Sequence, residues 1–289
     1  MTKNSAQKTV LITGCSSGFG LLIAAHLAKK DYNVIATMRN LKKQSALLNE
    51  VNLRNASVSI KQLDVTNTKS IDKCMAEIAE QVGYVDVLIN NAGYGIAGAF
   101  EDLSDKEIRD QFDTNFFGVQ NVTRACIPLM RTRRSGKIIN MSSISGFSAS
   151  PCFGAYCASK WALEGFSESL RYELKQFNID VLLIEPGSYI TKIFTDNAKV
   201  AKNYANPQSP YFKLSELMKE RVEKSTADNF KDVEEIAILT EKLIRQKRPK
   251  FRNIPDVESK TQYLFRKFLP FKWYENIVTS VVKLKNLNK

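Results

Sequence analysis

Tyr156 and Lys160, four residues apart, are the pair of side chains in this sequence best suited to acid–base chemistry. Positions four apart share one face of an α-helix, so the phenol and the ammonium would lie side by side. An unperturbed tyrosine has a pKa of about 10, and a neighbouring cation favours the phenolate and lowers that pKa. A phenol tuned in this way exchanges protons efficiently near neutral pH. An ordinary surface pair is the alternative, so the elements around the motif have to decide between them.

Short apolar runs alternate with helical patterns up to about residue 190, which predicts a parallel β-sheet with helices on both faces. Six runs are typical of strands buried on both faces: 8–14, 33–39, 57–64, 86–93, 137–143 and 180–187. Helical periodicity marks 20–30, 71–83 and 233–246, and 249–254 is a candidate last strand. The pattern therefore indicates an α/β fold.

After Gly187 the pattern changes to a long polar segment, 188–230, which contains Pro207 and Pro210. A connection of this length in a compact domain is more often a lid or a binding segment than filler, and we expect it to carry short helices. Its aromatic residues favour a bulky apolar substrate: Tyr189, Phe194, Tyr204, Tyr211 and Phe212. Residues 255–289 form a C-terminal extension.

A glycine-rich stretch, TGCSSGFG at 13–20, joins the first predicted strand to the first predicted helix. Glycines let the backbone approach a diphosphate, and a helix N-terminus offers free N–H groups and a positive dipole end. We therefore predict dinucleotide binding, with plain turn glycines as the alternative. An NAD site usually has an acid about 20 residues further on. Residues 37–40 read TMRN instead, and Arg39 can pair with a 2′-phosphate, which favours NADP(H) over NAD(H).

The chain is basic, with a net charge of +12, and residues 260–289 hold seven basic side chains against one acid, Glu275. A basic excess suggests acidic partners such as a phosphorylated cofactor, anionic lipid or nucleic acid. We expect no nucleic-acid partner, because no binding signature for one is found. For 260–289 we favour a helix packed on the core with its basic face in water. The alternative is a weak peripheral contact with a membrane surface.

The cysteines and the histidine argue against a metal site. Cysteines 15, 74, 126, 152 and 157 form no CxxC pair, and His26 is the only histidine. We expect Cys15, Cys152 and Cys157 to be packing residues, and His26 to lie on a helix surface. An odd cysteine count favours a reducing compartment. The N-terminus shows no signal peptide and no apolar run could span a membrane, so we expect a cytoplasmic protein.

Several motifs, in their order and spacing, give the chain a resemblance to the short-chain dehydrogenase/reductase family. They are TGCSSGFG (13–20), LDVT (63–66), NNAG (90–93), Asn115, SS (142–143), YCASK (156–160) and PGSYIT (186–191). The resemblance spans residues 8 to about 191, and YCASKWALEGFSESLRYEL is similar to the branch of 17-beta-hydroxysteroid and retinol dehydrogenases. It implies a three-layer, doubly wound Rossmann-type domain over 1–289, about seven parallel strands, a C-terminal helical extension, and a homodimer or homotetramer.

The resemblance also implies site residues. Tyr156 would be the general acid/base and Lys160 its partner and a ribose anchor, while Ser143 would hold the substrate oxygen. Asn115 would support a water chain to Lys160. The implied cofactor-binding residues are Thr13, Gly14, Ser16, Ser17, Gly18, Phe19, Gly20, Arg39, Asp64, Val65, Asn91, Ala92, Gly93, Tyr156, Lys160, Pro186, Gly187 and Thr191.

Within that set the resemblance places Asp64 and Val65 at the adenine and Thr191 at the nicotinamide carboxamide. Two positions depart from the family pattern. Phe19 stands where the family often has isoleucine, and Tyr189 stands where it usually has valine or isoleucine.

These features predict an NADP(H)-dependent oxidoreductase that interconverts a carbonyl and an alcohol on a bulky hydrophobic substrate. Hydride would pass between the nicotinamide and the carbonyl carbon, and Tyr156 would exchange the proton with the oxygen. Ser143 would donate a hydrogen bond to that oxygen. One alternative is a non-catalytic NADPH-binding sensor on the same fold. Another is a lipid-surface protein in which the C-terminal segment dominates function.

Overall fold

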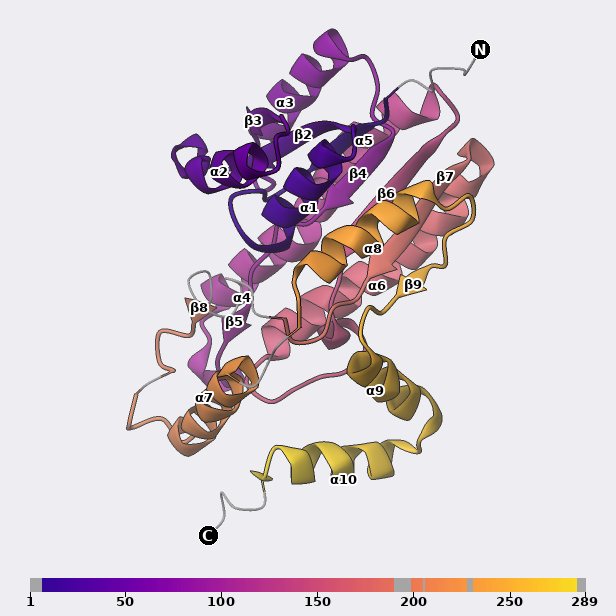
Figure 1. The fold of residues 1–289 in the computed structure, drawn as a ribbon. Helices are drawn as coiled ribbons and strands as arrows, with labels where there is room; N and C mark the ends of the chain where they lie inside the picture. The colour runs from indigo at the N-terminus through magenta and orange to yellow at the C-terminus, as the bar shows by residue number, and fades with distance from the viewer. Residues whose placement is uncertain (1–6, 190–198, 205, 228–230, 285–289) are drawn as a thin grey trace.

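A seven-stranded parallel sheet forms the centre of the protein (Figure 1). The computed structural model describes residues 7–189, 199–204, 206–227 and 231–284. In sheet order, the strands are β3 (Ser59–Gln62), β2 (Asn33–Met38), β1 (Thr9–Ile12), β4 (Val87–Asn90), β6 (Gly136–Met141), β7 (Ile179–Ile184) and β9 (Arg252–Asn253). The order reverses between β1 and β4, and sheets of this kind bind ligands at that point, beyond the carboxyl ends of the strands.

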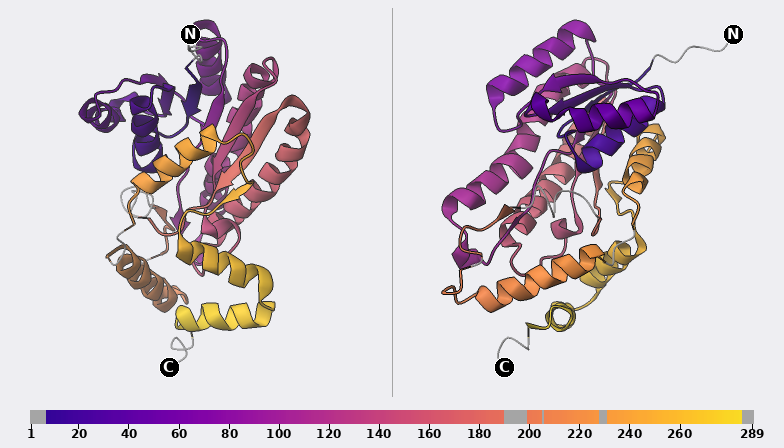
Figure 2. Two further views of the ribbon diagram at one scale, coloured as in Figure 1. Left: turned by 45° about the vertical axis from the view of Figure 1, so that its right-hand side comes forward. Right: turned by 60° about the vertical axis from the view of Figure 1, so that its left-hand side comes forward.

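Helices cover both faces of the sheet, which confirms the predicted three-layer α/β fold (Figure 2). One face packs against α1 (Gly18–Lys29), α2 (Ser45–Leu53) and α8 (Glu234–Arg245). The other packs against α3 (Thr68–Gln81), α5 (Gly118–Arg131) and α6 (Gly154–Leu174). Alternate residues of a strand point to opposite faces, so β1 sends Val10 and Ile12 into the first layer and Leu11 into the second.

The predicted burial of the strands is wrong for β3. This strand forms the edge of the sheet, and its Ser59 and Gln62 are exposed. Lys61 is buried, but its ammonium lies 2.9 Å from the carboxylate of Glu77 on α3. An edge strand has one neighbour instead of two, so polar side chains reach water or a helix partner there.

The position predicted for His26 is also wrong. Its ring is buried between α1 and α8, with Nδ1 2.9 Å from Glu234 and Nε2 2.7 Å from Glu241. The Glu234 carboxylate also accepts hydrogen bonds from Arg54, just beyond α2. His26 is buried because α8 covers this side of α1. The polar network around it therefore links α1, the end of α2 and α8.

The remaining elements lie beyond the carboxyl ends of the strands. They are β5 (Ile96–Ala97), α4 (Asp105–Phe112), a π-helical turn (Asp113–Phe117), β8 (Lys199–Val200), α7 (Phe212–Ala227), α9 (Val257–Phe268) and α10 (Phe271–Val281). Short 3-10 helices span Leu41–Lys43, Phe100–Asp102, Ile144–Gly146 and Lys175–Phe177. Strands β5 and β8 pair in parallel as a small second sheet that the sequence did not predict.

The C-terminal region is helical, as expected. Helix α7, with 16 residues, is longer than the short helices predicted within 188–230. Helices α9 and α10 follow β9 and lie at the end of the molecule opposite the N-terminus (Figure 1). No helix in the described ranges is both long enough and apolar enough to cross a bilayer.

Candidate active site

The glycine-rich loop after β1 is held by the chain that follows β4. Gly14 has a φ of +75°, and a Cβ there would lie 2.8 Å from the Cα of Ala92, so only glycine fits without strain. Asn91 donates from Nδ2 to the carbonyl of Thr13 at 2.9 Å and to that of Gly14 at 3.1 Å. The Thr13 hydroxyl accepts from the N–H groups of Asn91 and Ala92. The loop is therefore built as a rigid edge of the site.

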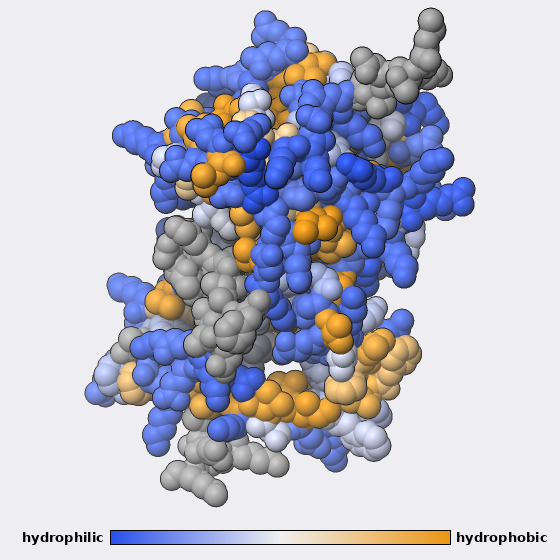
Figure 3. Space-filling view, viewed as in Figure 1, coloured by the Kyte–Doolittle hydropathy of each residue, from blue (hydrophilic) through white to orange (hydrophobic). Residues whose placement is uncertain are grey.

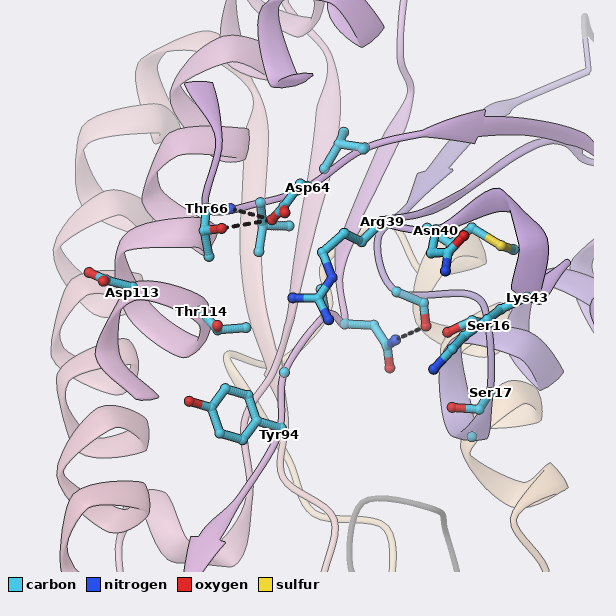
Figure 4. Close-up of a pocket in the computed structure, with 18 of the residues that line it drawn as sticks. Ser16, Ser17, Arg39, Asn40, Lys43, Asp64, Thr66, Tyr94, Asp113 and Thr114 are labelled. Atoms are coloured by element: carbon cyan, nitrogen blue, oxygen red, sulfur yellow. Dashed lines mark hydrogen bonds between the residues drawn. The ribbon is translucent and has the colours of Figure 1, made fainter. Parts of the chain in front are cut away.

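A cavity of about 740 Å³ lies beyond this loop (Figure 4). Pockets of this size suit cofactors. Its walls bring together eleven of the predicted cofactor residues: Gly14, Ser16, Ser17, Gly18, Phe19, Arg39, Asp64, Val65, Asn91, Ala92 and Gly93. Others in the walls were not predicted to bind cofactor, notably Asn40, Lys43, Thr66 and Tyr94. The predicted nucleotide-binding segments thus meet around one space.

Two cations point into this cavity from the end of β2. Figure 4 shows Arg39 and Lys43 directed into it, with the hydroxyls of Ser16 and Ser17 nearby. Asn40 caps the turn between the two cations by accepting from the N–H of Lys42 at 3.0 Å. Among the described residues, neither Arg39 nor Lys43 forms an ion pair. A pair of cations beside hydroxyls can bind a phosphomonoester.

Asp64, at the end of β3, both lines the cavity and shapes the turn beside it. Its Oδ1 accepts from the N–H of Thr66 at 3.0 Å and from the Thr66 hydroxyl at 2.8 Å (Figure 4). Both of these hydrogen bonds are accepted by Oδ1, and the same carboxylate borders the cavity. Asp64 therefore stabilises the turn after β3 and borders the cavity with one carboxylate.

The candidate acid–base pair lies on the buried face of α6. Tyr156 and Lys160 are 4% and 6% exposed, and the Lys160 ammonium is 5.8 Å from the centre of the Tyr156 ring. Lys160 donates to the carbonyl of Met141 at the end of β6, at 2.7 Å. Two residues further on, Ser143 starts a 3-10 turn and hydrogen-bonds Tyr156. Strand β6 and helix α6 thus place the three groups together.

The predicted lowering of the Tyr156 pKa is not found in the protein alone. Burial raises the pKa of Tyr156 to about 12, although its hydrogen bond with Ser143 acts in the opposite direction. Burial also lowers the pKa of Lys160 to about 8, against the attraction of Glu164. The cause is desolvation, which disfavours both charged forms and here outweighs the interaction between the two side chains.

Behind Lys160 lies a buried charge cluster that the sequence analysis missed. Glu164, one helical turn after Lys160, accepts a 2.5 Å hydrogen bond from Ser142 and also pairs with Arg252 on β9. Arg252 bridges to Glu185 at 2.5 Å. Burial raises the pKa of Glu185 to about 8, helped by the nearby charge of Glu164. The four-residue spacing of Lys160 and Glu164 was the one sequence signal that could have revealed part of this cluster. Arg252 and Glu185 are distant in sequence and come from other parts of the fold.

Asn115 lies in the π-helical turn that joins α4 to α5. It donates from Nδ2 to the carbonyl of Tyr94 at 2.9 Å and to the hydroxyl of Ser159 at 3.3 Å, and its Oδ1 accepts from the N–H of Tyr94. π-helical turns occur frequently at functional sites. This one is buried and ties the segment after β4 to the residue that precedes Lys160.

A second cavity, of about 600 Å³, has Tyr156 in its wall. Ser143 and Tyr156 line it together with Gly187 and Tyr189. Further walls come from Met218 and Arg221 of α7, from Phe265 of α9, and from Tyr274, Ile277, Val278 and Val281 of α10. The C-terminal extension therefore builds part of this cavity.

The aromatic residues predicted to meet substrate are mostly elsewhere. Tyr189 lines the second cavity, but Tyr204 turns its hydroxyl to the carbonyl of Ser215 and Tyr211 pairs with Glu101. Phe212 does not line the cavity either. The reason is that Tyr204 is held by α7 and Tyr211 by the 3-10 turn that contains Glu101, while Phe265 of α9 and the side chains of α10 supply the apolar part of the wall. Phe194 lies outside the described residues.

The other predicted cofactor residues occupy three kinds of position. Thr13, Gly20, Lys160 and Pro186 line neither cavity. Gly20 packs closely behind the loop, since a Cβ there would lie 2.3 Å from the Asn91 amide nitrogen. Tyr156 and Gly187 line the second cavity and not the first. Thr191 lies outside the described residues.

The family model of short chain dehydrogenases matches residues 8–201. The chain therefore belongs to the short-chain dehydrogenase/reductase family, a family of oxidoreductases, as its motifs predicted. An uncharacterized oxidoreductase of Bacillus subtilis, YusZ, is 38% identical over 275 residues, which covers 94% of this chain and 97% of that protein.

Two further relatives carry names that state an activity. Human retinol dehydrogenase 8 is 45% identical over 194 residues, covering 65% of this chain and 61% of its own length. The 3-ketodihydrosphingosine reductase of Bacteroides thetaiotaomicron is 44% identical over 193 residues, covering 67% and 68%. The chain thus spans less than two thirds of retinol dehydrogenase 8, and it falls in the branch similar to retinol dehydrogenases.

Solved structures agree with this assignment. A short-chain dehydrogenase from Streptomyces avermitilis matches with a TM-score of 0.80 at 30% identity, covering 100% of both chains. A metagenomic short-chain oxidoreductase in complex with NADP matches at 0.59 and 31%, covering 63% of this chain and 82% of that one. A Burkholderia phymatum enzyme in complex with NAD matches at 0.79, covering 90% and 93%; its 23% identity shows the shared fold alone.

Proposed function

We propose that the protein is an NADP(H)-dependent oxidoreductase that interconverts a carbonyl and an alcohol on a bulky hydrophobic substrate. One observation carries the proposal: Tyr156 and Ser143 line a second cavity, and its wall meets the wall of the first where Tyr189 packs edge to face against Phe19. The first cavity is the one bordered by Arg39 and Lys43. The Tyr156 ring packs against Gly95, next to Tyr94 in the wall of the first cavity. A cofactor and a substrate would therefore meet at the phenol.

The first cavity fits a phosphorylated dinucleotide. The glycine-rich loop 13–20 would face the diphosphate, and Asp64 and Val65 would border the adenine. Arg39 and Lys43 would bind the 2′-phosphate, and Lys160 the nicotinamide ribose. The bound cofactor supplies the hydride, whereas the protein positions and polarises the substrate.

The protein's own groups handle the proton. In the reductive direction, the phenol of Tyr156 donates its proton to the carbonyl oxygen while Ser143 donates a hydrogen bond to the same oxygen. The high pKa of Tyr156 keeps its proton in place until negative charge develops on the substrate. Lys160, together with the positive charge of an oxidised nicotinamide, would stabilise the resulting phenolate. Asn115 would hold the water chain to Lys160 through its place beside Ser159.

The walls of the second cavity support an apolar substrate. Its described lining is rich in aromatic and aliphatic side chains from α7, α9 and α10. Two relatives are named for retinol and for 3-ketodihydrosphingosine, which also supports an apolar substrate. The segment 188–230, which includes α7, would close over the substrate as a lid.

Three further inferences accompany this function. The family resemblance favours a homodimer or homotetramer, which sedimentation velocity would test. The five cysteines are free and buried, which supports a reducing, cytoplasmic location that cell fractionation would test. We expect no nucleic-acid partner.

The decisive experiment is a screen of hydrophobic ketones and aldehydes with NADPH, followed by loss of its absorbance. The enzyme should consume NADPH faster than NADH with at least one substrate, and Tyr156→Phe should remove that consumption. The sensor alternative makes the opposite prediction, because NADPH would then bind with no turnover of any compound in the panel.

A further inference from the structure

The C-terminal helices expose large apolar side chains to solvent. Phe268 at the end of α9 is 70% exposed, and Phe271 and Trp273 at the start of α10 are 62% and 63% exposed. Val257 and Leu264 extend the same exposed surface along α9. Large exposed apolar side chains that gather on one part of a protein mark a contact with another molecule or a membrane. We call these five residues the aromatic face; Figure 3 shows apolar side chains gathered along α9 and α10.

The favoured prediction for the C-terminal segment holds in part: Lys260, Lys267 and Lys272 face water, and Tyr274 is buried. A helix packed on the core with its basic face in water would bury its aromatic residues. Here only a narrow strip is buried: Tyr274 reaches the hydroxyl of Ser148, and Val282 packs near Met218 of α7. The rest of α10 stands clear of the sheet (Figures 1 and 2).

Basic side chains surround the aromatic face. Lys260, Lys267 and Lys272 are exposed on the same two helices. Arg266 lies 5.6 Å from the ring centre of Phe271, and Lys267 lies 5.2 Å from that of Phe268. Helices that rest in a lipid interface combine aromatic and aliphatic residues with lysine and arginine in this way. The lysine stems can bury their methylenes while the ammonium reaches the headgroups.

The aromatic face continues into the substrate cavity. Phe265 of α9, and Ile277 and Val281 of α10, line the cavity and are also 46%, 39% and 51% exposed. Glu258, Thr261 and Gln262 of α9 also line the cavity, so the apolar path from the cavity to the outer surface runs along Phe265 and the α10 residues. A molecule dissolved in a bilayer could pass along this path without crossing bulk water.

We propose that the aromatic face of α9 and α10 docks on an anionic phospholipid bilayer and presents the mouth of the substrate cavity to lipid-borne substrates. The route for the substrate rests on the proposed function; the docking does not. A second copy of the chain fits this surface less well. A twofold contact would place Lys260, Lys267 and Lys272 near their own copies, with only Glu258 and Glu275 as acids on the two described helices.

The test is co-sedimentation of the full chain with vesicles of phosphatidylcholine and phosphatidylserine, compared with phosphatidylcholine alone. Binding should require phosphatidylserine and weaken as salt rises. The double substitution Phe268→Glu with Trp273→Glu should weaken binding by at least about tenfold, because each ring would bury apolar area in the interface. Neither residue lines the substrate cavity. Leu53→Glu is the matched control, since Leu53 is 80% exposed on the distant α2, and it should bind like the unmodified protein.

Two results would overturn the proposal. The first is an absence of binding to phosphatidylserine vesicles at low salt. The second is dissociation of an oligomer when the double substitution is made. Sedimentation velocity without lipid would detect it, and it would show that the aromatic face is a contact between copies of the chain. Turnover separates docking from the proposed function: the double variant should keep its rate with a water-soluble ketone and lose rate only with a ketone presented in vesicles. If the double variant lost its rate with the water-soluble ketone as well, the two residues would act on the chemistry and not only on docking.

Discussion

The rings of Phe19 and Tyr189 meet edge to face, with centres 5.8 Å apart and planes at 75°. These are the two positions that the sequence analysis named as departures from the pattern of the family it resembles. Phe19 lies at the start of α1 in the glycine-rich loop, and Tyr189 lies beyond β7 in the wall of the substrate cavity. Two departures that look unrelated in the sequence are one contact in the structure, and it joins the two cavities.

We expect the two residues to be energetically coupled. Edge-to-face aromatic pairs contribute about 0.5–1.5 kcal/mol beyond their buried area. Phe19→Ile and Tyr189→Val should therefore each destabilise the protein, and the double substitution should cost less than the sum by about that amount. Urea unfolding of the four proteins measures the coupling. Strict additivity would show that the contact contributes nothing specific.

Tyr156→Phe should remove turnover but leave cofactor affinity nearly unchanged. The ring and its packing remain while the proton is lost, and acid–base catalysis contributes about 10²–10⁴-fold. Lys160→Ala should behave differently, with a lower rate and weaker NADPH binding, because Lys160 would also hold the ribose. Steady-state rates and NADPH fluorescence titrations compare the two. A Tyr156→Phe enzyme with near-normal kcat would exclude the phenol as the proton donor.

Arg39 should set the preference for NADPH. A charge-assisted hydrogen bond is worth roughly 1.5–3 kcal/mol, so Arg39→Ala should raise the KM for NADPH by about tenfold to a hundredfold. NADH kinetics should barely change, because NADH has no 2′-phosphate. Lys43→Ala should act in the same direction, since its side chain borders the same space.

Two controls accompany this prediction. Lys42→Ala changes a neighbouring cation that does not line the cavity, and should leave both KM values unchanged. Arg39→Asp should invert the preference, since a carboxylate repels the phosphate and accepts from the 2′-hydroxyl. Equal KM values for the two cofactors in the unmodified enzyme would contradict the assignment.

Glu164→Gln should move the alkaline limb of the pH–rate profile to lower pH. The Glu164 carboxylate raises the pKa of Lys160 against the effect of burial, which lowers it to about 8. Without that carboxylate the pKa of Lys160 falls further, so the cation is lost at a lower pH than in the unmodified enzyme. The rate should fall by up to about tenfold near pH 8 and much less near pH 6, since one pKa unit is about 1.4 kcal/mol.

The control for this variant is Glu168→Gln, one turn further along α6 and exposed. It should leave the profile in place. A Glu164→Gln enzyme whose rate drops equally at every pH would point to lost packing around Ser142, and not to the charge of Lys160.

Local patterns were sufficient for much of the fold. Apolar runs and helical periodicity located every strand of the central sheet and helices α1, α3 and α8, because these segments bury whole faces and their spacing records it. The glycine-rich loop, Arg39 and the Tyr156–Lys160 pair were also visible, since each depends on residues close together in the chain. The sequence did not show that β3 lies at the edge of the sheet, because the order of the strands depends on the path of the whole chain.

Only the tertiary structure decided which distant residues meet. Glu164, Arg252 and Glu185 form one buried cluster from three elements, and Lys43 joins Arg39 through a capped turn. Desolvation behaves in the same way: the sequence places a cation beside Tyr156, but the raised pKa of the phenol follows from how completely the fold excludes water. Likewise, the sequence holds the aromatic and basic residues of 260–289, whereas the packing of α9 and α10 decides that the aromatic rings face outward. Contacts between segments depend on the path of the whole chain, which no local pattern records.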